Sequence, residues 1–153
     1  MILLCYGTRP EYIKMKPVIE EFDEEKINYK ILFTGQHTDL LPKKAVHGID
    51  YKLDIIDGPN RLDSIVASIM NQQAIWQDGE LSHVMVQGDT TSAMAVGLAA
   101  FHRKIPVIHL EAGLRTYDNL NPYPEEFNRQ VISRLASIHL CPTNHDAQNI
   151  RQE

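Results

Sequence analysis

Carboxylates and cations are concentrated in one part of the sequence, residues 87–129. Asp89 and Glu111 each follow an apolar run, and Glu125 and Arg129 stand four residues apart in a segment that opens like a helix. Carboxylates transfer protons, and arginines neutralise anions. In a chain that alternates strands and helices, polar groups directly after apolar runs are where chemistry is usually placed, so this stretch is the first candidate for a functional site.

The elements that must position these groups belong to an ordinary globular chain. Its 153 residues, 43% of them hydrophobic, are enough for a single domain with a substantial core. The net charge of −5 gives no indication of nucleic acid or an anionic membrane as a partner. No apolar run approaches the ~18 residues of a membrane span. Residues 1–6 lack a basic segment and a cleavage site, so they predict a first strand rather than a signal peptide.

Apolar runs alternate with amphipathic segments along the whole chain, which predicts an α/β fold with a Rossmann-like, doubly wound parallel sheet. We expect one such domain over residues 1–153, with the strand order 3-2-1-4-5-6. The expected strands are 2–6, 29–34, 51–55, 83–86, 105–110 and 138–141, and the expected helices are 8–22, 40–47, 62–77, 91–102, 125–137 and one that Asn144 caps.

In this strand order ligands bind beyond the carboxyl ends of the strands, where the first and fourth strands are neighbours. The loops at that point are residues 7–11 and 87–91, and the loop after the fifth strand starts at Glu111. We therefore expect their polar groups to meet in one cleft. Asp89 and Thr90 compete to cap the following helix, and the residue that does not cap it is free to face the cleft.

Residues 7–11, Gly-Thr-Arg-Pro-Glu, allow two interpretations. Thr8 and Glu11 have the spacing of a capping box, so the segment could be only a well-capped turn. Alternatively, the free N–H groups of the helix and the charge of Arg9 could bind an anion. The chain has neither Gly-x-Gly-x-x-Gly nor a Walker A motif, so nothing supports a dinucleotide or P-loop site.

Other residue patterns are also open to structural explanations. Glu125 and Arg129 could form an exposed i,i+4 ion pair on a helix whose buried stripe would be Phe127, Val131 and Leu135. The seven histidines lack metal-ligand spacing, so we expect no metal site. Two cysteines lie in apolar runs, which predicts buried thiols rather than a disulfide, and hence a reducing, cytoplasmic compartment. These are Cys5 and Cys141.

Taken together, the motifs resemble the UDP-N-acetylglucosamine 2-epimerases of the non-hydrolysing bacterial type. They follow the family's order and approximate spacing from the first residues to the last, and the set is far more specific than any one member. The matching stretches are 7–11 and 13–15 (GTRPE, IKM), 34–37 (TGQH), 86–91 (VQGDTT), 109–116 (HLEAGLRT), 124–129 (PEEFNR) and 142–143 (PT).

The resemblance implies a two-domain glycosyltransferase-B architecture with the active site between two Rossmann-like halves. It implies an isomerase that interconverts UDP-GlcNAc and UDP-ManNAc for cell-surface polysaccharide biosynthesis, by eliminating UDP to a 2-acetamidoglucal and adding it back. Neither a cofactor nor a metal takes part. Asp89, Glu111 and Glu125 resemble the carboxylates for proton transfer and sugar contacts. The substrate-binding cations are matched by Arg9, Lys14, Arg115 and Arg129.

Family members are more than twice as long as this chain, and their second domain brings most nucleotide contacts. The chain therefore resembles the N-terminal half, which we expect to be inactive alone and, in the whole enzyme, to form a homodimer. Gln36, His37 and Arg61 match an allosteric UDP-GlcNAc site of some members, although Asp39 replaces an expected glutamine. Two alternatives remain open: a hydrolysing 2-epimerase or glycosyltransferase of similar fold, and a non-catalytic module that binds nucleotide sugars.

Overall fold

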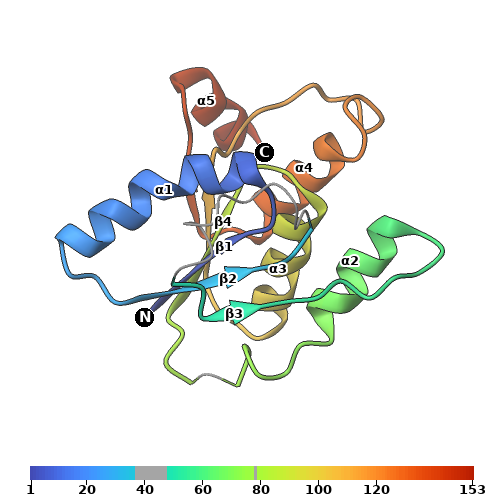
Figure 1. Cartoon of the computed structure of the whole chain (residues 1–153). Helices are drawn as coiled ribbons and strands as arrows, with labels where there is room; N and C mark the ends of the chain where they lie inside the picture. Colours follow the sequence, from blue (N-terminus) through green and yellow to red (C-terminus); the bar gives the residue numbers. More distant parts are fainter. Residues whose placement is uncertain (37–47, 78) are drawn as a thin grey trace.

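A parallel β-sheet forms the centre of the chain, as a computed structural model shows for residues 1–36, 48–77 and 79–153 (Figure 1). In this described part the sheet has six strands in the order β3-β2-β1-β4-β5-β6. The predicted doubly wound sheet is confirmed. The elements are β1 (Ile2–Tyr6), α1 (Arg9–Glu24), β2 (Tyr29–Phe33), β3 (Tyr51–Lys52), α2 (Arg61–Met70), β4 (His83–Gln87), α3 (Thr91–His102), β5 (Val107–Leu110), α4 (Glu125–Leu135), β6 (Ile138–Leu140) and α5 (Asn144–Gln152).

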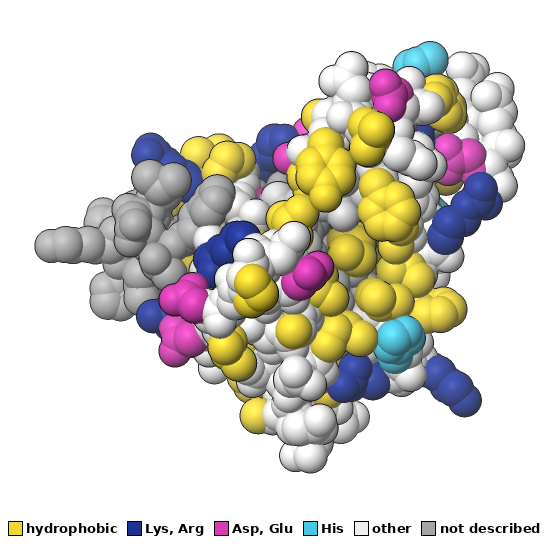
Figure 2. All heavy atoms as spheres, turned by 90° about the vertical axis from the view of Figure 1, so that its right-hand side faces the viewer, with side chains coloured by type: hydrophobic (Ala, Val, Ile, Leu, Met, Phe, Trp, Pro, Cys, Tyr) yellow, Lys and Arg dark blue, Asp and Glu magenta, His cyan; other side chains and the backbone are white. Residues whose placement is uncertain are grey.

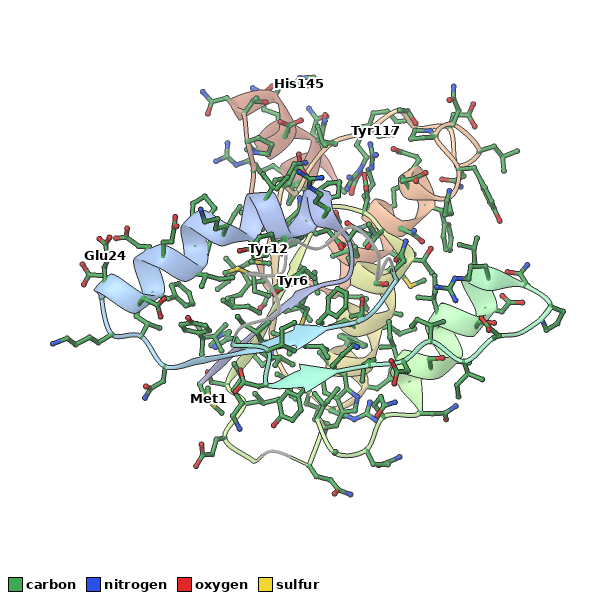
Figure 3. All side chains as sticks on the ribbon, viewed as in Figure 1. Met1, Tyr6, Tyr12, Glu24, Tyr117 and His145 are labelled. Carbon is green, nitrogen blue, oxygen red and sulfur yellow. The ribbon has the colours of Figure 1, made fainter. Side chains whose placement is uncertain are left out.

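The alternation of side chains along the strands separates two apolar cores. Leu4 and Tyr6 of β1 pack with α1 on one face, where the rings of Tyr6 and Tyr12 lie 5.4 Å apart (Figure 3). Leu3 and Cys5 pack on the other face, which α2, α3 and α4 cover. Helix α3 packs closely on this face because its buried positions are small, including three alanines with no exposed surface. They are Ala95, Ala99 and Ala100.

Several bounds differ from the expected ones by one or two residues, such as that of β5, which begins at Val107 rather than at residue 105. Three elements differ more. Helix α2 ends at Met70 rather than at residue 77, because residues 71–73 (Asn-Gln-Gln) supply no apolar side chain for the core, whereas Ile75 is buried beyond the helix. Strand β3 has two residues instead of five. The predicted stripe of α4 is wrong: Phe127 is 51% exposed, because the helix turns a different face inward. The buried residues of α4 are Glu126, Asn128 and Ile132.

Smaller differences concern caps and thiols. Thr143, not Asn144, caps α5, since its hydroxyl accepts a hydrogen bond from the Asp146 N–H group. Both cysteines are free, but only Cys5 is buried and Cys141 is partly exposed. The expected helix 40–47 lies outside the described residues. None of the described helices is long and apolar enough to cross a membrane.

Candidate active site

A hollow of about 400 Å³ lies where the sequence predicted a cleft, beyond the carboxyl ends of β1, β4 and β5. It brings together Lys14 of α1, Asp89 after β4, Glu111 after β5 and Glu125 at the start of α4. The predicted convergence of these loops is therefore confirmed. The lining residues are Thr8, Pro10, Glu11, Lys14, Gln36, Gln87, Gly88, Asp89, Thr90, Glu111 and Glu125.

Glu111 reaches the hollow through an unusual backbone conformation. Its φ of 68° lies in the left-handed region, which costs a residue other than glycine roughly 1–2 kcal/mol. The Glu111 N–H donates to the Leu140 carbonyl at 3.0 Å, which fixes the turn. Lys14 Nζ contacts the two carboxylate oxygens at 2.6 and 2.7 Å, and Gln87 Nε2 donates to one of them. Strain of this kind is often retained where a side chain has a function.

Asp89 is free to face the hollow because Thr90 caps α3: the Thr90 hydroxyl accepts from the Ala93 N–H at 3.0 Å. Arg129 Nη2 donates to the Asp89 carboxylate. Burial raises the pKa of Asp89, and Glu125 and Glu111 raise it further, while Arg129 lowers it; the net direction is upward. A carboxyl group with a raised pKa exchanges its proton closer to neutral pH, as acid–base catalysis requires.

The turn at the start of α1 is already occupied by a carboxylate of the chain. Glu11 is 2% exposed and accepts hydrogen bonds from the Gly7 and Thr8 N–H groups, both at 2.7 Å. Its other oxygen accepts from the Thr90 hydroxyl at 2.6 Å. The capping box is thus confirmed. Glu11 occupies the Gly7 and Thr8 N–H groups, while an anion site at the first N–H groups of the helix with Arg9 stays a prediction. Arg9 is exposed, and no hydrogen bond or ion pair joins it to another described residue.

Two of the predicted cations have partners within the protein and do not line the hollow. Arg129 does not pair with Glu125 as its spacing suggested; it bonds Asp89 and lies 3.4 Å from Glu126. The side chain of Arg115 is buried and bonds the Glu153 carboxylate at 2.6 Å, which connects the loop after β5 to the last residues. The geometry gives no support to a substrate contact for Arg115.

The predicted allosteric residues lie in part beside the hollow. Gln36 lines it, and its side-chain oxygen accepts from the Ser92 hydroxyl at 2.6 Å. Arg61 donates to the Gln36 carbonyl at 3.2 Å and forms a long ion pair with Asp57. His37 lies outside the described residues. The side chains therefore connect the loop after β2 to α2 and α3.

Histidine and glutamine at the strand ends have roles that the sequence did not reveal. His109 is buried, and its Nε2 atom lies 2.7 Å from the Gly88 carbonyl. Burial lowers the pKa of His109 to about 4, so it is neutral near pH 7. Gln87 is the polar end of a buried strand, a position that could have marked it as a site residue.

Within the described residues no three His, Cys, Asp or Glu side chains form a group that could hold a metal.

A doubly wound parallel sheet with carboxylates at its switch point defines the chain as a Rossmann-like α/β structure with a candidate ligand site. Within that class, residues 20–153 match the model of the UDP-N-acetylglucosamine 2-epimerase family. The chain belongs to this family. The fold is that of the N-terminal half of a glycosyltransferase-B architecture.

Known proteins of this family are similar to the chain along nearly its whole length. A UDP-N-acetylglucosamine 2-epimerase of Campylobacter jejuni is 41% identical over 99% of the chain, and the chain covers 41% of it. The crystal structure of UDP-GlcNAc 2-epimerase from Neisseria meningitidis bound to UDP-GlcNAc has a TM-score of 0.87 and 37% identity, with 99% of this chain and 42% of that one covered. The chain thus spans about two fifths of the relatives it matches.

Proposed function

We propose that the chain is the N-terminal domain of an enzyme that interconverts UDP-GlcNAc and UDP-ManNAc. The observation that carries the proposal is the hollow at the switch point, in which Asp89, Glu111 and Glu125 face one space beside Lys14. The relatives support it: one solved structure holds UDP-GlcNAc, and another, from Methanocaldococcus jannaschii, holds UDP-GlcNAc and UDP. The missing C-terminal domain would close the hollow and supply most contacts to the nucleotide, so this chain alone is inactive.

The chemistry assigns a task to each group. Removal of the proton at C2 and loss of UDP from C1 give a 2-acetamidoglucal; protonation of C2 on the other face and return of UDP complete the inversion. The three carboxylates supply the proton acceptor, the proton donor and sugar contacts. Lys14 places a positive charge against Glu111, and Arg129 does the same for Asp89. The reaction changes no oxidation state, so the proposal includes no cofactor and no metal.

Incubation of the full-length gene product with UDP-GlcNAc tests the proposal. We expect an equilibrium mixture with UDP-ManNAc, detected by proton NMR, with activity unchanged by EDTA. Free ManNAc and UDP would indicate a hydrolysing 2-epimerase instead, and transfer of the sugar to an acceptor would indicate a glycosyltransferase. Binding of UDP-GlcNAc without any turnover would indicate a non-catalytic module.

We place the enzyme in the cytoplasm, where it would supply a precursor of cell-surface polysaccharide. Recovery of the enzyme in a membrane or secreted fraction would contradict this location.

We also propose that the enzyme is a homodimer, in which an apolar groove of about 310 Å³ between α2, α3 and α4 faces a second copy. Figure 2 shows hydrophobic side chains gathered on this side of the molecule. Leu120, Tyr123 and Phe127 border the groove and are 75%, 64% and 51% exposed. Contiguous exposed apolar side chains commonly mark protein interfaces.

Light scattering of the full-length protein tests the dimer. The wild type should have twice the monomer mass, and Phe127→Glu should lower it to the monomer mass by placing a charge in the interface. Ile13→Glu is the matched control, since Ile13 is 57% exposed but lies on α1, outside the groove. A monomeric wild type, or a dimeric Phe127→Glu variant, would rule out this arrangement.

A further inference from the structure

We propose that Glu126 is a positioning residue that acts on Asp89 through Arg129. This role depends on the proposed function only because Asp89 is taken to be a proton-transfer group. Glu126 has no exposed surface, and it does not line the hollow. The sequence shows it only as the second glutamate of Pro-Glu-Glu, next to the better candidate Glu125.

The Glu126 carboxylate is fixed by four groups from two segments. One oxygen accepts from the Thr116 N–H at 3.0 Å and lies 3.4 Å from Arg129 Nη1. The other accepts from the Tyr117 N–H at 3.0 Å and from Gln130 Nε2 at 2.8 Å. Burial alone would raise the pKa of Glu126, but these hydrogen bonds and the charge of Arg129 lower it, so the group is ionised at neutral pH.

The guanidinium of Arg129 links this buried charge to Asp89. Its Nη1 atom faces Glu126 and its Nη2 atom donates to Asp89, while its side chain is 12% exposed. The Nε atom is buried and has no hydrogen-bond partner among the described residues. The two carboxylates therefore determine where the guanidinium lies, and they divide the attraction of one positive charge between them.

This division has a direct consequence for proton transfer. Asp89 faces Arg129 and Glu125 on α4 and Glu111 after β5, and Lys14 binds Glu111. If Glu126 lost its charge, Arg129 would act on Asp89 alone and would stabilise the Asp89 carboxylate more strongly. Glu126 thus keeps the pKa of Asp89 higher than it would be if Arg129 were paired with Asp89 alone.

Replacement Glu126→Gln in the full-length protein, labelled with carbon-13 at the aspartate carboxyl groups, tests this role. The signal that is lost in Asp89→Asn identifies Asp89, and its NMR titration gives the pKa whether or not the protein turns over substrate. We expect Glu126→Gln to lower the pKa of Asp89 by about one unit, a tenfold change in its proton affinity. One limb of the pH profile of kcat/KM should move to lower pH by the same amount.

Two further variants keep the test decisive. Gln130→Met removes a hydrogen bond to Glu126 but not its charge, so the pKa of Asp89 should stay at the wild-type value. Glu126→Asp keeps a buried charge for folding but moves it away from Arg129. It should lower the pKa of Asp89 by less than Glu126→Gln does. An unchanged or raised pKa of Asp89 in folded Glu126→Gln or Glu126→Asp would overturn the proposal. Failure of the proposed function alone would show as absent turnover with the pKa shift still present.

Discussion

Replacement of Glu111 by glutamine in the full-length enzyme is expected to lower kcat by roughly 10²- to 10⁴-fold, the usual contribution of a positioned acid or base. The amide has nearly the same shape, so the turn held by the Leu140 carbonyl should persist. It cannot accept or return a proton, and it no longer balances the charge of Lys14, 2.6 Å away in the wild type. Asp89→Asn should have an effect of similar size, since it removes the group whose pKa is raised.

The measurement is the initial rate of UDP-ManNAc formation, with circular dichroism to verify the fold. Glu20→Gln is the matched control, because Glu20 is an exposed carboxylate paired with a lysine on α1, Lys16, away from the hollow. It should retain wild-type kcat. Near-native kcat in both Glu111→Gln and Asp89→Asn would show that these two carboxylates do not transfer the proton. Glu125 would then be the remaining candidate.

The convergence of Asp89 and Glu111 could be predicted from the sequence because it depends on topology. Apolar runs identified β1, β4 and β5, and in a doubly wound sheet their carboxyl ends must share an edge. The competition between Asp89 and Thr90 for one helix cap could also be stated in advance. Only the structure could decide it, since the outcome depends on Arg129, forty residues later in the chain.

The partners of buried charges could not be predicted in this way. The i,i+4 spacing of Glu125 and Arg129 describes an isolated helix, but α4 packs with Glu126 inward, and this turns Arg129 toward Asp89. Glu11 was recognisable as part of a capping box, yet nothing in the spacing showed that its second oxygen would reach the Thr90 hydroxyl. Both contacts join segments that are distant in sequence, where local patterns carry no information.

Replacement of Gly113 by alanine is expected to destabilise the fold by about 3 kcal/mol or more, from overpacking and left-handed strain together. Gly113 has a φ of 93°, and a Cβ atom there would lie 2.2 Å from the Asp146 carbonyl oxygen. That oxygen belongs to the backbone of α5, so it cannot move aside alone. Asn149 of the same helix donates to the Gly113 carbonyl at 2.9 Å, which holds the helix against the loop.

Gly48→Ala separates the two contributions, because Gly48 has a φ of 94° but no described heavy atom within 4 Å of the added carbon. It should cost only the strain, about 1–2 kcal/mol, and urea unfolding of each variant gives the difference. Equal losses in both variants would show that α5 yields to the added methyl group. A larger loss for Gly113→Ala would show that α5 is rigidly packed against the loop that begins at Glu111. The strained turn that aims this carboxylate into the hollow would then depend on the close contact between Gly113 and Asp146.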